Sequence, residues 1–154
     1  MPIDQPFPRR VNAPGPDSPW LPPAGAGTEL VPAGVWWDAV RVRLGIGERL
    51  LARLGPAAGA VLKDPCDHRL YLLTDPGSTA DWAFTSYAAE VQLLSTATWV
   101  AIPPRDRIRA RGPYWLVPPD GDECCLTETG RLHAAVVGAL AEVLGPRTGE
   151  PPVV

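Results

Sequence analysis

Residues 90–119, EVQLLSTATWVAIPPRDRIRARGPYWLVPP, decide the fold that we expect for this chain of 154 residues. Two similar phrases stand within them, WVAIPP at 99–104 and WLVPP at 115–119. Aromatic and β-branched residues favour strands, and proline ends a strand because it has no N–H group to donate to a neighbouring strand. The stretch therefore predicts two buried strands, each closed by a pair of prolines, with a connection between them.

The connection carries an arginine at every second position: Arg105, Arg107, Arg109 and Arg111. Alternate side chains of an extended segment point to one side, so these four guanidinium groups can meet several phosphates together. Arg41 and Arg43, on an earlier strand, extend the basic surface. We expect these six arginines to bind single-stranded nucleic acid or a nucleotide. The alternative is a solvated loop in a chain rich in arginine.

The rest of the chain carries further strand patterns and two helical ones. The run LYLL at 70–73 is apolar on both faces, which is typical of a central strand. Apolar residues recur every four positions from Ile46 to Leu54 and from Leu132 to Leu144, as on the buried side of a helix. Thr127 can cap the second helix. We expect residues 78–89 to form a loop that Trp82 and Phe84 anchor to the core.

The expected elements are strands at 35–43, 60–63, 69–74, within 91–102 and at 115–117, with helices at 46–54 and 128–144. This order predicts an α+β fold: a single mixed or antiparallel sheet of about five to six strands, with two main helices on one face. The length suits one domain. We place that domain at 34–145, after a flexible arm rich in proline and glycine at 1–33 and before a flexible tail at 146–154.

Composition bounds the location and the partners. The net charge is −3, so no overall positive field draws the chain to nucleic acid or membrane, and a basic patch must be local. A single lysine beside many arginines, alanines, glycines and prolines indicates a bacterium with a high-GC genome. An odd number of cysteines, no signal-peptide pattern and no long apolar run together favour a cytoplasmic protein with no membrane partner.

Asp38 is the first candidate for chemistry. In a strand over 35–43 its side chain shares a face with Trp36, Val40 and Val42. A carboxylate among apolar neighbours needs a polar partner, a metal ion or an opening to solvent.

A resemblance to a known family appears when these segments are taken together. The strand that carries Asp38, then RLYL at 69–72, Pro76-Gly77, WVAIPP at 99–104 and Tyr114-Trp115 resemble the primase–polymerase (Prim-Pol) domain of bifunctional replication proteins. The likeness covers residues 34–119. It implies an α+β fold and two-metal nucleotidyl transfer, for which carboxylates hold Mg²⁺. Asp38, His68 and Glu90 are the residues that stand near the family's catalytic positions.

This chain departs from the family's pattern at each of these positions. The second aspartate, two residues after the first, is replaced by Val40, and His68 stands three rather than two positions before Tyr71. Glu90 or Gln92 falls near the third acid without clean register. The resemblance therefore indicates a degenerate, non-catalytic member that needs no cofactor, with Mg²⁺ expected only if the chain is active. A surface turn is the alternative interpretation of His68.

Two other functions remain open. The chain can be a protein–protein interaction module that uses its proline-rich arm or a sheet edge to hold a partner or a second copy of itself. An active metal-dependent primase or polymerase is the least favoured reading. Cys66, His68, Cys124 and Cys125 could hold zinc, but adjacent cysteines chelate poorly, and cysteines packed as small hydrophobic residues are the alternative.

Overall fold

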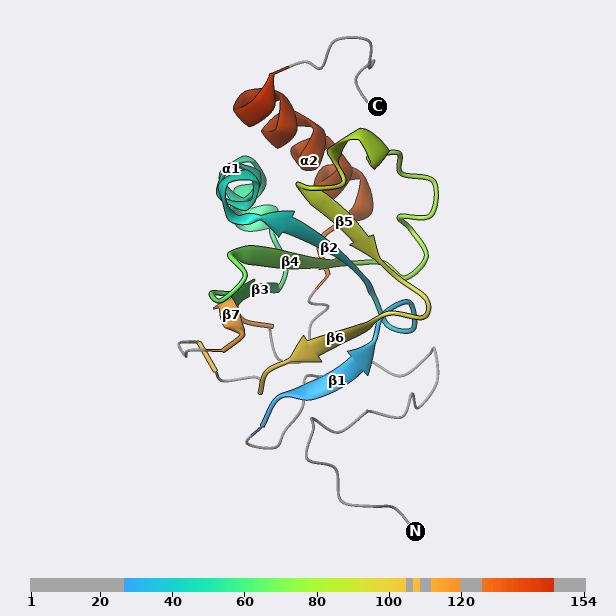
Figure 1. The fold of residues 1–154 in the computed structure, drawn as a ribbon, viewed down its shortest axis with the longest axis vertical. Coiled ribbons are helices and arrows are strands. Elements are labelled where there is room, and N and C mark those ends of the chain that lie inside the picture. The colour runs from blue at the N-terminus through green and yellow to red at the C-terminus, as the bar shows by residue number, and fades with distance from the viewer. Residues whose placement is uncertain (1–26, 105–106, 109–111, 120–125, 146–154) are drawn as a thin grey trace.

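The computed structural model describes residues 27–104, 107–108, 112–119 and 126–145, and it confirms the α+β class (Figure 1). Two short 3₁₀ helices, η1 and η2, accompany two α-helices and seven strands in these residues. The elements are β1 (Glu29–Pro32), β2 (Asp38–Arg43), α1 (Leu44–Leu54), η1 (Gly55–Ala57), β3 (Val61–Asp64), β4 (Arg69–Thr74), η2 (Thr85–Tyr87), β5 (Val91–Leu94), β6 (Trp99–Ile102), β7 (Tyr114–Val117) and α2 (Thr129–Leu144).

The strands form two sheets rather than the single sheet that we expected. A five-stranded sheet has the order β5-β2-β4-β3-β7, and β1 pairs with β6 as a separate two-stranded ribbon. All the pairs between these strands are antiparallel. The expectation that residues 70–73 form the central strand is confirmed, because β4 lies in the middle of the larger sheet.

Each face of β4 packs against a different layer, as Figure 1 shows. Leu70 and Leu72 belong to the cluster that also contains the apolar residues of α1 and α2. Leu73 belongs to a second cluster, in which Val31 of β1 and Val100 of β6 pack against the five-stranded sheet. The fold is therefore a helical layer, a sheet and a ribbon that covers part of the opposite face.

Two expected boundaries were wrong. Residues 29–32 fall in the expected arm, yet they form β1, whose Val31 is fully buried. The strand expected from residue 35 begins at Asp38, because residues 33–36 turn. The turn is closed by a hydrogen bond from the Gly34 N–H to the Trp37 carbonyl, with a positive φ at Gly34 that favours glycine.

The two proline-closed phrases are only half buried. They lie in different sheets, WVAIPP as β6 in the ribbon and WLVPP as β7 at an edge of the larger sheet. Trp99 is 39% exposed and Leu116 is 42% exposed, whereas Val100, Ile102 and Trp115 are buried. Both strands are thus covered on one side only, and alternate residues meet solvent.

The segment between β4 and β5 is mostly loop, as expected, and aromatic rings hold it to α2. Phe84 is buried, and Trp82 packs against the same cluster. His133 of α2 meets both rings, with its centroid 4.8 Å from that of Trp82 and 5.5 Å from that of Phe84. The segment is therefore held on the helical side of the sheet.

Close packing of α1 on the sheet depends on Gly47. A Cβ atom at this position would lie 2.9 Å from Leu70 Cγ and still closer to Leu70 Cδ1, in the middle of the core. At Gly45, in the same helix, the nearest atom to such a Cβ is Arg43 Nη1 at 3.8 Å, an ordinary contact.

In the described residues, neither α1, α2 nor any other helix has both the length and the apolar character that a membrane span requires.

Gly47→Ala should lower the free energy of unfolding by about 1–2 kcal/mol, because overpacking outweighs the gain in helix propensity. Gly45→Ala is the matched control and should raise this free energy slightly, since alanine fits there without a clash. Denaturant titration of both variants measures the difference. Equal stability of the two variants would contradict the close approach of α1 to β4.

Glu128, rather than the expected Thr127, caps α2. Its carboxylate accepts hydrogen bonds from the N–H groups of Gly130 at 3.0 Å and Arg131 at 2.9 Å. These two bonds lower the pKa of the Glu128 carboxyl below its ordinary value. The Thr127 hydroxyl is used elsewhere, because it accepts the N–H of Gly59 at 2.9 Å.

Glu128→Ala should lower the thermal midpoint at neutral pH, since two N–H groups of the helix lose their acceptor. The folded-state pKa lies below the unfolded one, so this contribution is present above about pH 4.3 and is lost as the pH falls through the folded-state pKa. The midpoints of variant and parent should therefore converge in acid. Glu128→Ser keeps an uncharged cap and should therefore lose less stability than Glu128→Ala at neutral pH. A difference in thermal midpoint between parent and Glu128→Ala that stays constant with pH would contradict the role of the carboxylate.

Candidate functional site

Asp38 is fully buried, and hydroxyl groups satisfy its carboxylate. One oxygen accepts the Thr79 hydroxyl at 2.8 Å and the Thr79 N–H at 3.3 Å, and the other accepts the Ser95 hydroxyl at 2.7 Å. From the sequence we expected the Asp38 carboxylate to need a polar partner, a metal ion or an opening to solvent. The structure shows that it has polar partners. Asp38 fastens the segments on either side of β5 to the first strand of the larger sheet.

His68 and Glu90 lie at the other end of β2 from Asp38. Asp38 pairs with Thr74 at one end, while Arg43 pairs with Arg69, the residue after His68. The Arg43 N–H also donates to the Glu90 carbonyl at 3.0 Å. The five steps from Asp38 to Arg43 span about 17 Å of extended backbone. The three candidate catalytic residues therefore do not share one site.

His68 is an exposed residue of the turn between β3 and β4, as the alternative interpretation held, and its φ is 56°. Cys66 is exposed in the same turn, whereas Cys124 and Cys125 lie outside the described residues. Across residues 27–104, 107–108, 112–119 and 126–145, no three histidine, cysteine or acidic side chains gather closely enough to hold a metal ion.

A cluster of arginines occupies the open part of the sheet face that looks away from the helices. We call it the basic face. Arg41 pairs across the sheet with Tyr71 and with Gln92, and Arg43 pairs with Arg69. Alternate residues of a strand share a face, so these five side chains point away from the helical layer. They lie on the same face of the sheet as the buried residues under the ribbon. The basic face consists of Arg41, Arg43, Arg69, Tyr71 and Gln92.

Local contacts hold Arg41 and Arg69 in place. Arg41 Nη2 lies 3.0 Å from Asp67 Oδ2, and the Arg41 guanidinium lies 5.7 Å from the centre of the Tyr71 ring. Arg69 Nη1 donates to the carbonyl oxygens of Asp67 at 3.1 Å and His68 at 3.4 Å. Burial raises the pKa of the Tyr71 phenol above its ordinary value, and Arg41 partly offsets this rise.

Three polar atoms of the basic face are buried without a hydrogen-bond partner among the described residues. They are Arg41 Nε, Arg69 Nε and Gln92 Oε1. The half-exposed Arg43 guanidinium makes no hydrogen bond or ion pair with any described residue. A ligand that brings acceptor oxygens to this face could therefore gain charged hydrogen bonds with Arg43.

Arg107 is the one residue of the arginine row that can be placed, since Arg105, Arg109 and Arg111 lie outside the described residues. Its Nη1 donates to the Thr28 hydroxyl at 3.2 Å, and its carbonyl accepts the Trp115 N–H at 2.8 Å. These bonds place Arg107 beside β7, at the edge of the sheet. Arg107 therefore lies beside a different strand from the residues of the basic face, which belong to β2, β4 and β5.

Sequence reasoning missed Arg69, Thr79 and Ser95. Arg69 could have been found, because it stands two positions before Tyr71 in a strand and must share its face. Thr79 and Ser95 lie in segments without periodicity, so no local pattern predicts that they meet Asp38.

No protein-family model, curated protein or solved structure matches this chain. The resemblance to Prim-Pol domains thus rests on the sequence segments alone. The proposals that follow are argued from the side chains of the chain itself.

Asp38→Ala should lower the free energy of unfolding by about 3 kcal/mol or more, because buried donors lose their charged acceptor. Asp81→Ala, at an exposed acid of the same segment, is the control and should change it by less than about 0.5 kcal/mol. Denaturant titration measures both. Adding Thr79→Val and Ser95→Ala to Asp38→Ala should recover part of the loss, since the stranded hydroxyls are removed; no recovery would contradict the assigned hydrogen bonds.

Proposed function

We propose that this chain is a non-catalytic, Prim-Pol-like module that binds single-stranded nucleic acid or a nucleotide through the basic face. The observation that carries the proposal is the cluster of half-exposed guanidinium groups of Arg41, Arg43 and Arg69 on one face of the sheet, where Arg43 makes no hydrogen bond or ion pair with a described residue. Phosphate oxygens suit these donors, because a guanidinium presents several N–H groups in a planar fork.

The charge balance of the basic face supports an anionic ligand. Arg41, Arg43 and Arg69 give the basic face three positive charges. Of the acids in the neighbouring turn between β3 and β4, Asp67 already pairs with Arg41. Arg43 keeps its whole guanidinium available within the described residues. Because the chain as a whole carries a net charge of −3, attraction comes from this local surface and should be sensitive to salt.

Base recognition on this face would come from stacking rather than from hydrogen bonds to base edges. Arg41 covers the ring of Tyr71, so a base would meet a guanidinium plane first. Guanidinium groups stack on bases without strong sequence preference. Trp99 is exposed, but it pairs with Pro32 at one end of the ribbon. Arg107 bonds to Thr28, beside the other end, so Trp99 does not extend the stacking surface next to Arg107. The ligand expected is therefore a single strand bound with little sequence specificity.

The test is fluorescence anisotropy with a labelled single-stranded oligo-dT at several salt concentrations. Arg41→Ala/Arg43→Ala should weaken binding and reduce the salt slope by about 0.7 for each phosphate that the variant no longer neutralises. The matched control is Arg49→Ala/Arg53→Ala, which removes the same charge from α1 on the other side of the sheet. It should weaken binding much less.

Other outcomes of this experiment have definite meanings. If both double variants lose the same affinity for oligo-dT, the binding depends on the net charge of the chain and not on the basic face. If the parent does not bind oligo-dT even at low salt, the proposal is wrong. Arg107→Ala/Arg109→Ala tests whether the arginine row adds contacts. Template-dependent incorporation of nucleotide with Mg²⁺ or Mn²⁺, lost in Asp38→Ala, would instead support an active polymerase.

A further inference from the structure

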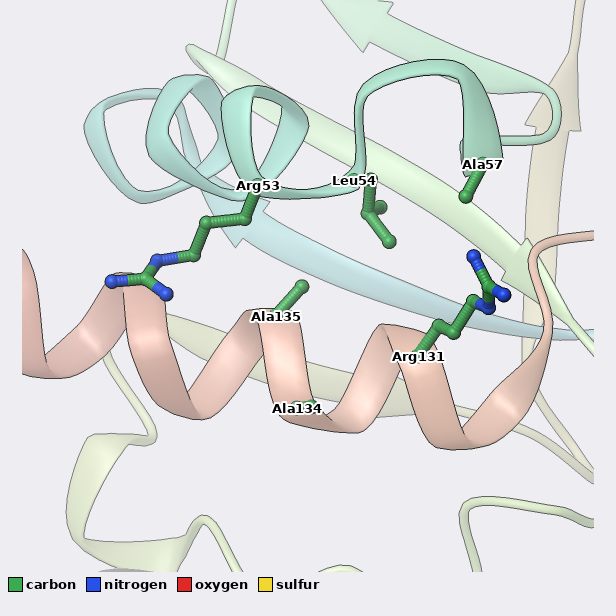
Figure 2. A pocket seen from close by; sticks show the side chains of 6 residues that line it. All are labelled: Arg53, Leu54, Ala57, Arg131, Ala134 and Ala135. Atoms are coloured by element: carbon green, nitrogen blue, oxygen red, sulfur yellow. The ribbon is translucent and has the colours of Figure 1, made fainter.

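A cavity lies on the helical side of the sheet, away from the basic face. It is an open pocket of about 280 Å³ between the end of α1, η1 and the first turns of α2 (Figure 2). This volume lies just below the usual range for small-molecule sites. Its lining consists of Arg53, Leu54, Ala57, Arg131, Ala134 and Ala135.

The cavity combines a small apolar floor with two cationic side chains. Leu54 and Ala135 are buried, and the alanines Ala57 and Ala134 leave room above them. In Figure 2 the Arg131 side chain rises from α2 toward Ala57, whereas the Arg53 side chain points away toward the far part of α2. The two arginines therefore stand at opposite ends of the cavity.

Only one of these arginines is already neutralised. Arg53 Nη2 and Nε lie 2.8 and 3.0 Å from Glu142 Oε2, and Arg49 contacts the other oxygen of Glu142 at 3.4 Å. The Arg131 guanidinium has no hydrogen bond or ion pair to any described residue. The Glu128 carboxylate accepts the N–H groups that it caps and interacts with Arg131 only through space. A cation without an ion pair among the described residues thus borders the cavity.

We propose that this cavity binds a small organic anion. Its carboxylate or phosphate group pairs with Arg131, and its apolar body covers Leu54 and Ala135. A guanidinium fork matches both anionic groups, and only an apolar body fills the rest of the space without losing hydrogen bonds to water. The site is separate from the basic face and does not depend on nucleic-acid binding.

The experiment is isothermal titration calorimetry of the full chain with phenyl phosphate and with benzoate. Benzyl alcohol supplies the apolar body without charge, and inorganic phosphate supplies charge without the body. At least one of the two organic anions should bind. Benzyl alcohol should bind at least about tenfold more weakly because it lacks the charged hydrogen bond, and inorganic phosphate should bind more weakly because it buries no apolar surface.

Three variants separate the causes. Arg131→Ala should weaken binding of the organic anion about tenfold or more, because the charged partner is removed. Arg49→Ala removes an equal charge outside the cavity and should leave the affinity unchanged. Ala134→Leu fills the space without changing charge, at an exposed helix position that accepts leucine, and should abolish binding.

The outcomes support or overturn the site itself. Failure of both organic anions to bind, binding unchanged in Arg131→Ala, or inorganic phosphate binding as well as phenyl phosphate would overturn it. A preference between phenyl phosphate and benzoate identifies the anionic group. Arg41→Ala/Arg43→Ala should leave this binding intact, so failure of the basic face and failure of the cavity are distinguishable.

Discussion

Two-sided burial of β4 is the constraint on which the rest of the structure depends. A strand that is apolar on both faces must be covered on both. The helices cover one face, and the ribbon of β1 and β6 covers the other. The ribbon strands have four residues each, whereas β2 and β4 have six. The ribbon-side cluster takes in Leu73 and Ala39, and Tyr71 of the basic face packs against it. The basic face thus lies next to this short second layer, on the same side of the sheet.

The two ends of β2 therefore carry different chemistry. At one end the buried Asp38 carboxylate draws hydroxyl groups from segments far along the chain, and this arrangement is closed and satisfied. At the other end the half-exposed Arg43 guanidinium makes no hydrogen bond or ion pair with a described residue. Such a division is common in proteins, because buried polar groups must be satisfied internally, while partly exposed ones can be completed by a ligand. The strand thus joins a structural end to an end suited to binding.

The sequence predicted what depends on local periodicity and missed what depends on distant partners. The α+β class, the central strand and the buried stripes of both helices follow from apolar spacing, and the structure confirms them. The pairing of WVAIPP with residues 29–32 has no local signal, because proline and glycine nearby suggested a flexible arm. Thr127 carries a good capping side chain, but the N–H of Gly59 occupies its hydroxyl. The placing of Arg69 beside Arg43, and of Gln92 beside Arg41, became known only with the strand partners.

The pairing of Glu29 with Ile102 joins strands that lie far apart in the sequence, and its consequence is kinetic. The hairpin of β3 and β4 closes across the four-residue turn 65–68, so its loop-closure entropy is small. The ribbon closes a much longer loop at a higher entropic cost, so we expect it to form late in folding. The elements of lowest local stability open first in the native state. Opening of the ribbon would uncover Trp115 and Ala39, and would lengthen the exposed sheet surface beside the arginines without unfolding the helical layer.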